Sequence, residues 1–240
     1  ANSDAHSPEK LGRNANLFDT QLSYSAMVEA MRSGNPEQFK GTIDMFPQEG
    51  KYHYGGHRKC GIRWNPVEAA RNGNICPVCG KKITMGVMNR VVDLSDRERI
   101  EERPNRLPFY SVIPLKEMLA EIEGVGENTK KVRERYHQLL PKFGTEFGLL
   151  LDAPLTEIRG KSGDVLAEAI RRMRNREVYI QEGFDGQYGE IKVFAPGEHK
   201  LLGAQNQLFQ ASADLAPKNE RPLLNFDLQE YRRLQKQAAE

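Results

Sequence analysis

The residues best suited to chemistry are a histidine and three cysteines in the first third of the chain. Two pairs with a two-residue gap, His57-Arg-Lys-Cys60 and Cys76-Pro-Val-Cys79, are separated by residues 61–75. Zn2+ takes four nitrogen or sulfur ligands in tetrahedral geometry, and sites closed by four such ligands are usually structural. The spacing therefore predicts a zinc ribbon in which Gly80, directly after the last cysteine, lets backbone N–H groups approach the sulfur atoms.

The residues leave two points of this motif open. His53 lies one turn from His57, so either histidine could be the fourth ligand. The cysteines could also be three free thiols, although an odd number cannot all pair and the spacing suits zinc better than a disulfide framework. We find no secretory signal in the sequence and expect a reducing, cytoplasmic setting.

A second pattern with metal-binding chemistry is Asp4-Ala5-His6, near the N-terminus. Positions two apart share one side of an extended segment, so the carboxylate and the imidazole would face the same way. Two ligands alone cannot hold a metal. The alternative is a solvent-exposed turn in which Asp4 or Ser7 caps the following helix.

Charge is unevenly distributed along the chain. At 240 residues and a net charge of +2, the chain could hold one large domain or two to three small ones. The hydrophobic fraction of 38% is low for one large core, and 28% charged residues indicate much exposed surface. Residues 51–90 carry eight basic residues and one acidic residue, whereas residues 1–50 carry four basic and seven acidic residues. This asymmetry predicts a polyanionic partner for the zinc ribbon, with DNA contacts at Arg58, Lys59, Lys81 and Lys82. The alternative is a solvated basic face. No apolar run is long enough to span a membrane.

Two segments further along have the pattern of a helix-hairpin-helix. Leu119–Gly126 ends an apolar helix on Gly124-Val-Gly126, and a second helix with Lys130 and Lys131 follows. Backbone N–H groups at the start of such a helix can bind a DNA phosphate without reading sequence. The alternative is a helix C-cap and turn with no ligand.

A second, looser copy covers Leu155–Gly163 and carries Gly160, Lys161 and Gly163. A helix rich in apolar residues follows it, with arginines at its end. We expect at least one of the two copies to contact the DNA backbone, with helix packing as the alternative.

The remaining elements are predicted from periodicity and capping residues. We expect one or two short helices within residues 17–32, strands at 42–46 and 83–88, and a helix from Asn65 with Pro66 in its first turn. Strands at 178–180 and 190–194 would flank the turn residues Asp185-Gly186. We expect residues 204–222 to be flexible and a terminal helix to follow Asp227.

These motifs together carry a family resemblance. Ser3–Pro8 with Gly12-Arg13 resembles the last metal-binding motif of a polymerase-and-histidinol-phosphatase (PHP) domain. The run from Thr42 to Cys60, followed by Cys76–Lys81, resembles the PHP-type DNA-repair endonucleases known as endonuclease Q. The resemblance continues through Gly183–Gly189 and covers roughly residues 1–195.

The resemblance implies a nuclease that nicks DNA beside deaminated bases. It implies that Asp4 and His6 bind a catalytic divalent metal (Zn2+, Mg2+ or Mn2+) in an intact PHP barrel, while the zinc module and a helical region grip DNA. A PHP site needs more His and Asp ligands than these two, so we expect this chain to be part of a longer protein and to lack nuclease activity alone. Some relatives continue into a superfamily 1 helicase, which makes a helicase a further candidate partner.

The sequence thus predicts a mixed α/β chain with five parts. They are a PHP remnant at residues 1–50, a zinc ribbon at 51–92, tandem helix-hairpin-helix motifs at 93–177, a β-hairpin at 178–195, and a flexible tail with a terminal helix at 196–240. The expected function is DNA binding in a metal-dependent repair endonuclease. The alternatives are a non-catalytic docking module attached to a DNA helicase, and a phosphoesterase for small substrates, which has little use for backbone-gripping hairpins.

Overall fold

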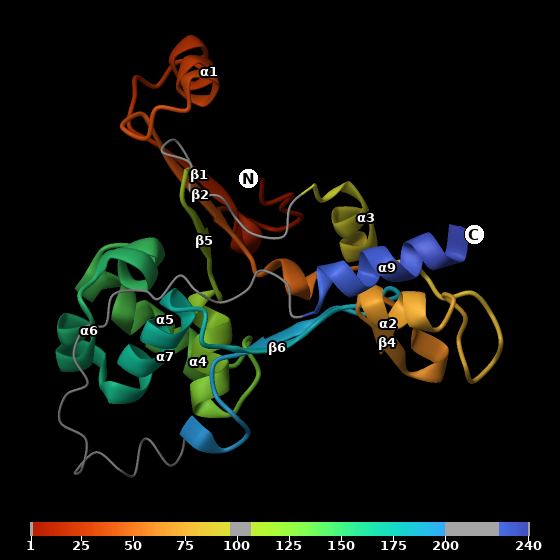
Figure 1. The fold of residues 1–240 in the computed structure, drawn as a ribbon. Coiled ribbons are helices and arrows are strands. Elements are labelled where there is room, and N and C mark those ends of the chain that lie inside the picture. Colours follow the sequence, from red (N-terminus) through yellow and green to blue (C-terminus); the bar gives the residue numbers. More distant parts are fainter. Residues whose placement is uncertain (1, 97–106, 200–225, 240) are drawn as a thin grey trace. The chain divides into compact units, whose positions relative to one another are not determined.

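The computed structural model describes residues 2–96, 107–199 and 226–239 (Figure 1). The chain divides into two compact units, each made of three separate stretches. The first unit comprises Ala1–Phe46, Glu102–Tyr179 and Lys192–Lys218, and the second comprises Pro47–Glu101, Ile180–Ile191 and Asn219–Glu240. No helix among the described residues is long and apolar enough to cross a membrane.

The first unit contains a three-stranded sheet in the order β1-β2-β5, made of β1 (Ala15–Phe18), β2 (Phe39–Asp44) and β5 (Phe109–Ser111). β1 pairs antiparallel with β2, and β5 pairs parallel with β2. Helix α1 (Tyr24–Ser33) connects β1 to β2 and lies at the far end of this hairpin (Figure 1). Ser23 caps the helix by accepting a hydrogen bond from Ala26 N, and Gly34 ends it in the left-handed conformation.

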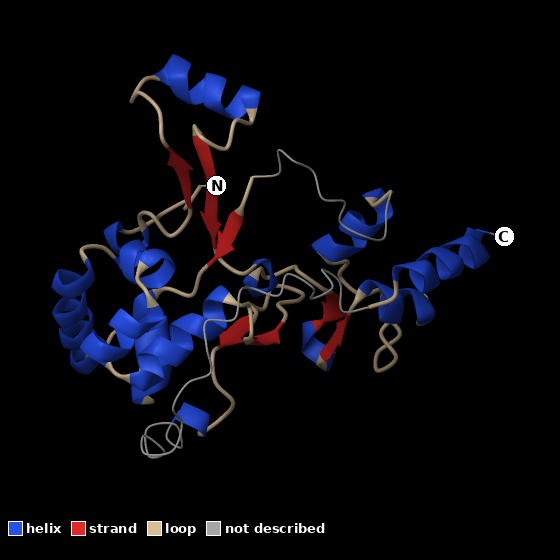
Figure 2. Ribbon diagram, turned by 60° about the vertical axis from the view of Figure 1, so that its left-hand side comes forward, coloured by secondary structure: helices blue, strands red, loops and turns tan. Residues whose placement is uncertain are grey.

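The helices of the first unit follow β5. They are α4 (Leu115–Glu123), α5 (Lys130–Phe143), α6 (Leu155–Ser162) and α7 (Asp164–Arg174), with a π-helical turn at Gly148–Asp152. Figure 2 shows them gathered into one cluster. Their apolar faces meet in a core whose fully buried members include Leu119, Leu149, Ile158, Leu166 and Ile170. Burial of these side chains supplies the main stabilisation of this helical cluster.

The second unit is built around two small elements. Strands β3 (Gly55–His57) and β4 (Ile62–Trp64) form an antiparallel hairpin, and α2 (Pro66–Arg71) follows directly. Asn65 caps α2, as predicted, and Glu68 completes a capping box in which the two side chains bond each other's backbone N–H groups. Helix α3 (Val87–Leu94) completes this part of the unit.

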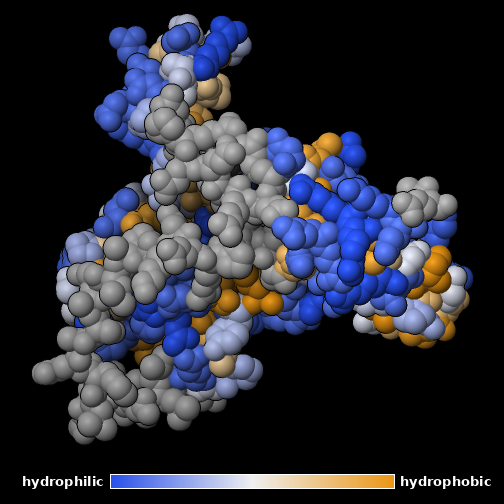
Figure 3. Space-filling model, in the orientation of Figure 1, coloured by the Kyte–Doolittle hydropathy of each residue, from blue (hydrophilic) through white to orange (hydrophobic). Residues whose placement is uncertain are grey.

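The C-terminal helix α9 (Leu228–Ala239) packs against the second unit through one apolar face. Leu228 and Tyr231 form a buried cluster with Val67 of α2 and Val92 of α3. Arg71 makes a bidentate contact with Glu230, at 2.6 and 2.7 Å from Nη2 to the two carboxylate oxygens. Hydrophilic residues cover the side of α9 that faces the viewer (Figure 3), so the helix is amphipathic. The predicted terminal helix is therefore present, and Asp227 accepts hydrogen bonds from Gln229 N and Glu230 N.

Strands β6 (Tyr179–Gln181) and β7 (Glu190–Lys192) form a two-stranded sheet, as predicted from the two apolar segments. The loop between them turns at Asp185 and Gly186, which both have positive φ. The predicted flexible segment at 204–222 lies outside the described residues.

Two predictions of secondary structure were wrong in part. Residues 15–18, placed partly in a helix, form strand β1, because pairing with β2 outweighs the local preference. The predicted strand at 83–88 does not form: Thr84 makes only an isolated bridge to Gly56, and α3 begins at Val87. Gly86 starts that helix where the backbone of Tyr54 leaves no room for a side chain, and Asn89 Oδ1 accepts the hydrogen bond of Gly86 N.

Candidate metal centre and nucleic-acid interface

His57, Cys60, Cys76 and Cys79 lie together in the second unit. Their ligand atoms all lie within 4.8 Å of one another. His57 Nδ1 lies 3.3 Å from Cys79 Sγ. Four such atoms at this separation can surround one ion, since Zn–S and Zn–N bonds are about 2.3 and 2.0 Å long. The cluster could therefore hold a metal ion, and its set of one nitrogen and three sulfurs suits zinc.

Each ligand pair is positioned by its own tight turn. His57 ends β3, and Cys60 ends a 3-10 turn at Arg58–Cys60 that Gly61 closes with a φ of 69°. Cys76 and Cys79 lie on the loop after α2, and Gly80 also has a φ of 69°. Both pairs thus end on a left-handed glycine. Gly80 is expected from the sequence motif, and Gly61, which was not singled out there, follows Cys60 in the same way.

His53 lies outside this cluster. Its backbone is held by His53 N donating to Gly50 O at 2.9 Å and by Met88 N donating to His53 O at 3.1 Å. Burial lowers the pKa of His53, although the nearby Glu182 charge raises it in part. Of the two candidate histidines, the structure brings His57 to the cysteines.

The electrostatics of the cysteines suit a cation. Burial raises the pKa of Cys76, but hydrogen bonds from the backbone N–H groups of Cys79 and Val78, together with His57, outweigh it and lower the pKa to about 6. The pKa of Cys60 is raised to about 11 by burial and by the neighbouring sulfurs of Cys79 and Cys76. Thiolates crowded in this way favour a positive ion among them, because metal binding requires and stabilises the deprotonated form.

Asp185 joins a distant loop to the ligand hairpin. Its Oδ2 accepts from Arg58 N at 2.7 Å, and its Oδ1 accepts from Thr84 Oγ1 at 2.5 Å. Burial raises the pKa of Asp185, but these two hydrogen bonds and the adjacent His57 and Arg58 outweigh it, so the pKa is lowered. The carboxylate therefore holds the turn beside His57 in place. No local signal in the sequence reveals this role.

The basic residues predicted to contact DNA surround the cluster at the surface. Arg58, Lys59, Lys81 and Lys82 are all exposed. Arg58 and Lys59 lie between the ligands His57 and Cys60, and Lys81 and Lys82 follow Cys79. The two turns that carry the ligands therefore also carry the positive charge. This arrangement gives the second unit an exposed group of cations suited to phosphate.

Asp4 and His6 lie at the surface of the first unit. Asp4 Oδ2 is 3.9 Å from His6 Nε2, and both side chains are 90% exposed. The two atoms are close enough to be ligands of the same cation, since oxygen and nitrogen ligands each lie about 2.0–2.2 Å from a zinc ion, but a bound ion needs further ligands. Asp4 has a φ of 44°, a conformation that Asp tolerates better than most residues.

The first predicted hairpin is formed by α4 and α5. Gly124 ends α4 in the left-handed conformation, and Thr129 caps α5 by accepting from Val132 N. Lys130 is exposed and lies 3.6 Å from Glu134, whereas Lys131 Nζ lies 2.5 Å from a carboxylate oxygen of Glu123. The charge of Lys131 is thus partly satisfied within the hairpin.

The second predicted hairpin differs from the first. Gly160 lies inside α6 instead of in a turn, and Gly163 alone separates α6 from α7. Lys161 Nζ donates to Glu157 Oε1 at 2.6 Å and to Lys142 O at 3.1 Å. Because Lys161 already has these partners, it is less available for phosphate than an unpaired lysine.

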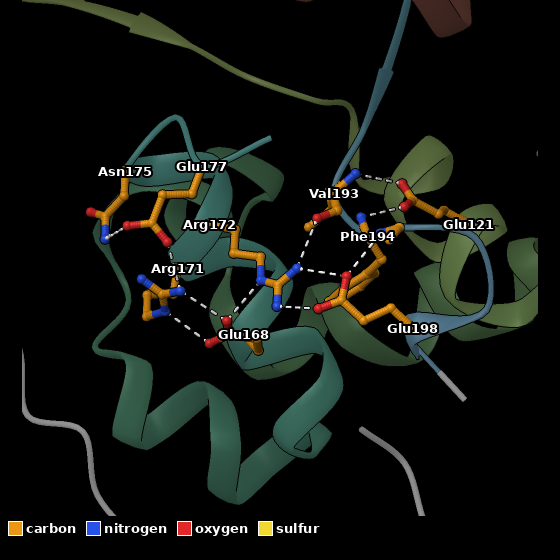
Figure 4. Close-up of polar contacts among 10 residues, drawn as sticks. Glu121, Glu168, Arg171, Arg172, Asn175, Glu177, Val193, Phe194 and Glu198 are labelled. Atoms are coloured by element: carbon orange, nitrogen blue, oxygen red, sulfur yellow. Dashed lines mark hydrogen bonds and ion pairs between the residues drawn. The ribbon is translucent and has the colours of Figure 1, made fainter. Parts of the chain in front are cut away.

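The arginines at the end of α7 bind other parts of the first unit (Figure 4). Arg172 donates to Glu168 Oε1 at 2.8 Å and to Glu198 Oε1 at 2.6 Å, and Arg171 also contacts Glu168. Glu121 accepts from the backbone N–H groups of Val193 and Phe194 at 3.0 and 2.7 Å. This network ties α4, α7 and residues 193–198 together, so these arginines have a structural role.

Comparisons with known proteins agree with the sequence resemblance. Residues 114–177 match the family model described as the MJ0043 C-terminal domain. The chain is 36% identical over 202 residues to the uncharacterized protein MJ0043 of Methanocaldococcus jannaschii, covering 80% of this chain and 25% of that protein.

Two solved structures are also similar. The lesion-specific endonuclease PfuEndoQ from Pyrococcus furiosus matches with a TM-score of 0.70 and 31% identity over 80% of this chain and 48% of that chain. Endonuclease Q in complex with a 27-mer duplex substrate, with an abasic lesion at the active site, matches with a TM-score of 0.68 and 30% identity over 82% and 50% of the two chains. The chain thus spans about half the length of these structures. In sequence and in fold, it is similar to endonuclease Q over about four-fifths of its residues.

Proposed function

We propose that this chain is a DNA-binding part of a repair endonuclease related to endonuclease Q. The observation that carries the proposal is the similarity, in sequence and fold, to an endonuclease Q bound to duplex DNA. The exposed cations beside the His57-Cys60-Cys76-Cys79 cluster support it independently, because exposed lysines and arginines gain affinity for DNA by releasing its counterions.

In this proposal the metal cluster has a structural role. A zinc ion bound by three cysteines and one histidine has no open coordination position for a substrate. It would join the β3-β4 hairpin to the Cys76–Cys79 loop, which fixes Arg58, Lys59, Lys81 and Lys82 on a short rigid frame. Phosphate contacts of this kind set position on the duplex and carry no sequence information.

The α4-α5 hairpin supplies a second grip in the proposal. Gly124 and Gly126 allow the tight connection, and the first N–H groups of α5 carry the partial positive charge of the helix terminus. Lys130 adds an exposed charge beside them. The α6-α7 connection at Gly163 contributes less to DNA binding, because Gly160 lies inside α6 and Lys161 is held by contacts within the unit.

Asp4 and His6 would contribute to a catalytic divalent metal site in the intact endonuclease. Such a metal polarises the phosphate and activates water. The carboxylate and imidazole would hold the ion and orient it. Two ligands do not make a multi-metal site, so we expect the chain alone to bind DNA without cleaving it.

Fluorescence anisotropy with a labelled duplex, measured over a range of salt concentrations, tests this function. We expect affinity to fall steeply with salt and the double variant K59A/K82A to reduce the slope of log K against log salt by about 2. The matched control is Arg32→Ala in α1, an exposed cation outside the zinc ribbon, which should leave the slope unchanged. Absence of DNA binding by the unmodified chain at low salt would refute the proposal.

A further inference from the structure

The three cysteines of the metal cluster differ in how far solvent reaches them. Cys76 is fully buried, Cys60 is half-buried and Cys79 is exposed. Residues 77–80 form a turn whose residues are all exposed, and Val78 in this turn is 66% exposed. Three free thiols are thus gathered at one place, and a reagent in solution meets Cys79 first.

Cys76 and Cys79 have the geometry of a pair that can form a disulfide. They lie three residues apart in a turn that Gly80 N closes by donating to Cys76 O at 2.9 Å. A tight turn keeps the Cα atoms of its first and fourth residues within about 7 Å, and a disulfide spans Cα atoms about 4.4–6.8 Å apart. Their sulfur atoms already lie within 4.8 Å of each other. A bond between them therefore needs side-chain rotation and little movement of the backbone.

The same sulfurs hold together the structure around them. Cys76 belongs to a small buried cluster with Ala69 and Ile83, against which Cys60 packs. A core of this size gives little stability by itself, so a bound metal would supply much of the folding free energy of the ribbon. Loss of two sulfur ligands would leave only His57 and Cys60, and two ligands cannot hold the ion.

The cluster also joins two pairs of cations into one group. Arg58 and Lys59 lie between the ligands on the β3-β4 hairpin, and Lys81 and Lys82 follow the exposed turn. Without the metal, Arg58 N keeps its hydrogen bond to Asp185, so the hairpin stays attached to the β6-β7 loop. The link from the hairpin to the exposed turn is lost, however, and the two pairs of cations no longer have a fixed separation.

We propose that Cys79 and Cys76 are a redox switch that responds to peroxide and lowers the affinity for DNA. This inference rests on the proposed DNA-binding function and adds its regulation. The Cys79 thiolate attacks one oxygen of hydrogen peroxide, so the O–O bond breaks, a sulfenic acid forms and hydroxide leaves. The Cys76 thiolate then attacks the Cys79 sulfur, so the S–S bond forms and a second hydroxide leaves. Two electrons pass from the two sulfurs to the peroxide.

The disulfide changes both the metal site and the DNA-binding surface. With two of the four ligands oxidised, the metal ion leaves with its charge unchanged. The cations of the two turns then neutralise fewer phosphates at once, so DNA affinity falls. A dithiol reverses the change by thiol–disulfide exchange, after which zinc can bind again.

Addition of hydrogen peroxide to the zinc-loaded full chain tests the chemistry. We expect release of the zinc, measured with a chromogenic chelator, together with the loss of two of the three thiols. Trypsin places Cys76 and Cys79 together on peptide 72–81 and Cys60 on peptide 60–63. Mass spectrometry should find the first disulfide within peptide 72–81, and dithiothreitol should reopen it. Retained zinc, or a first disulfide that includes Cys60, would overturn the proposal.

Two variants that each replace one sulfur by an imidazole form a matched pair. Cys60→His keeps the disulfide-forming pair and should release zinc like the unmodified chain. Cys79→His keeps four ligands without the exposed thiol, so it should retain zinc at the peroxide dose that empties the unmodified chain. Equal release from both variants would contradict the switch. If Cys79→His binds no zinc, the peptide masses from the unmodified chain still decide which cysteines react.

Fluorescence anisotropy with a labelled duplex connects the switch to DNA binding. Oxidation should weaken binding and lower the slope of log K against log salt by about 2, because one of the two pairs of cations loses its phosphates. Reduction followed by addition of zinc should restore both. Unchanged affinity after complete zinc release would refute the regulation and leave DNA binding intact. If the reduced, zinc-loaded chain binds no DNA, the proposed function fails, whereas zinc release and the disulfide still decide the chemistry of the switch.

Discussion

Replacement of Asp185 by alanine removes the two hydrogen bonds that join the β6-β7 loop to the metal-ligand hairpin. The amide of Arg58 and the hydroxyl of Thr84 would lose a charged acceptor at 2.7 and 2.5 Å. A hydrogen bond to a charged group contributes about 1.5–3 kcal/mol, and partial exposure of this site lets water replace some of it. We therefore expect the D185A variant to lose about 2–4 kcal/mol of unfolding free energy in the second unit.

Matched variants separate the two hydrogen bonds. Thr84→Val removes only the hydroxyl contact and should cost about 1–2 kcal/mol. The double variant D185A/T84V should be less destabilised than the sum of the two single variants, because both remove the same hydrogen bond.

The chain offers a direct assay for this unit. Trp64 is its sole tryptophan and packs against the buried cluster of Ala69, Cys76 and Ile83. Its fluorescence during urea unfolding at fixed zinc concentration reports the second unit. A D185A variant within about 0.5 kcal/mol of the unmodified chain would show that water replaces both contacts and refute the structural role of Asp185.

Two further predictions concern the metal and the effect of pH. Elemental analysis should find one zinc per chain. The His57→Ala variant should bind zinc weakly or not at all, whereas His53→Ala should bind it normally. The reverse pattern would show that His53 is the ligand. Burial raises the pKa of Glu168, but hydrogen bonds from Arg171 and Arg172 outweigh it, so the pKa is lowered in the folded chain. The ion pairs therefore stabilise the first unit above about pH 4.3, the unfolded pKa of Glu, and this contribution is lost as pH falls through the folded pKa. Circular dichroism during urea unfolding should show a shallower acid dependence in Glu168→Gln, and identical slopes would contradict the role of these pairs.

Neighbouring residues in the sequence were sufficient to predict several elements of the structure. The capping box of α2 depends on Asn65, Pro66 and Glu68, which are neighbours in the chain. The two ligand pairs likewise need only a turn that ends on glycine. Strand β1 could not be predicted in this way, because its conformation depends on pairing with β2 across an intervening helix.

The connection between α6 and α7 also shows that local sequence is insufficient, because here a local pattern predicted a turn that tertiary packing replaced with helix. Glycine spacing at 160 and 163 resembles that of 124 and 126, yet Gly160 continues α6 and only Gly163 ends it. Helix boundaries depend on packing as well as on the residue at the boundary, so similar glycine patterns can give different turns.

The sequence by itself determined which residues can bind a metal and where positive charge lies, because ligand spacing and charge are local properties. Only the tertiary structure decided that His57, and not His53, lies beside the cysteines. It alone brought Asp185 to Arg58 and Tyr188 to Lys51, across more than a hundred residues. Such contacts depend on how separate segments pack and on the close backbone approach at Gly183 and Gly189, and no spacing within the chain encodes them.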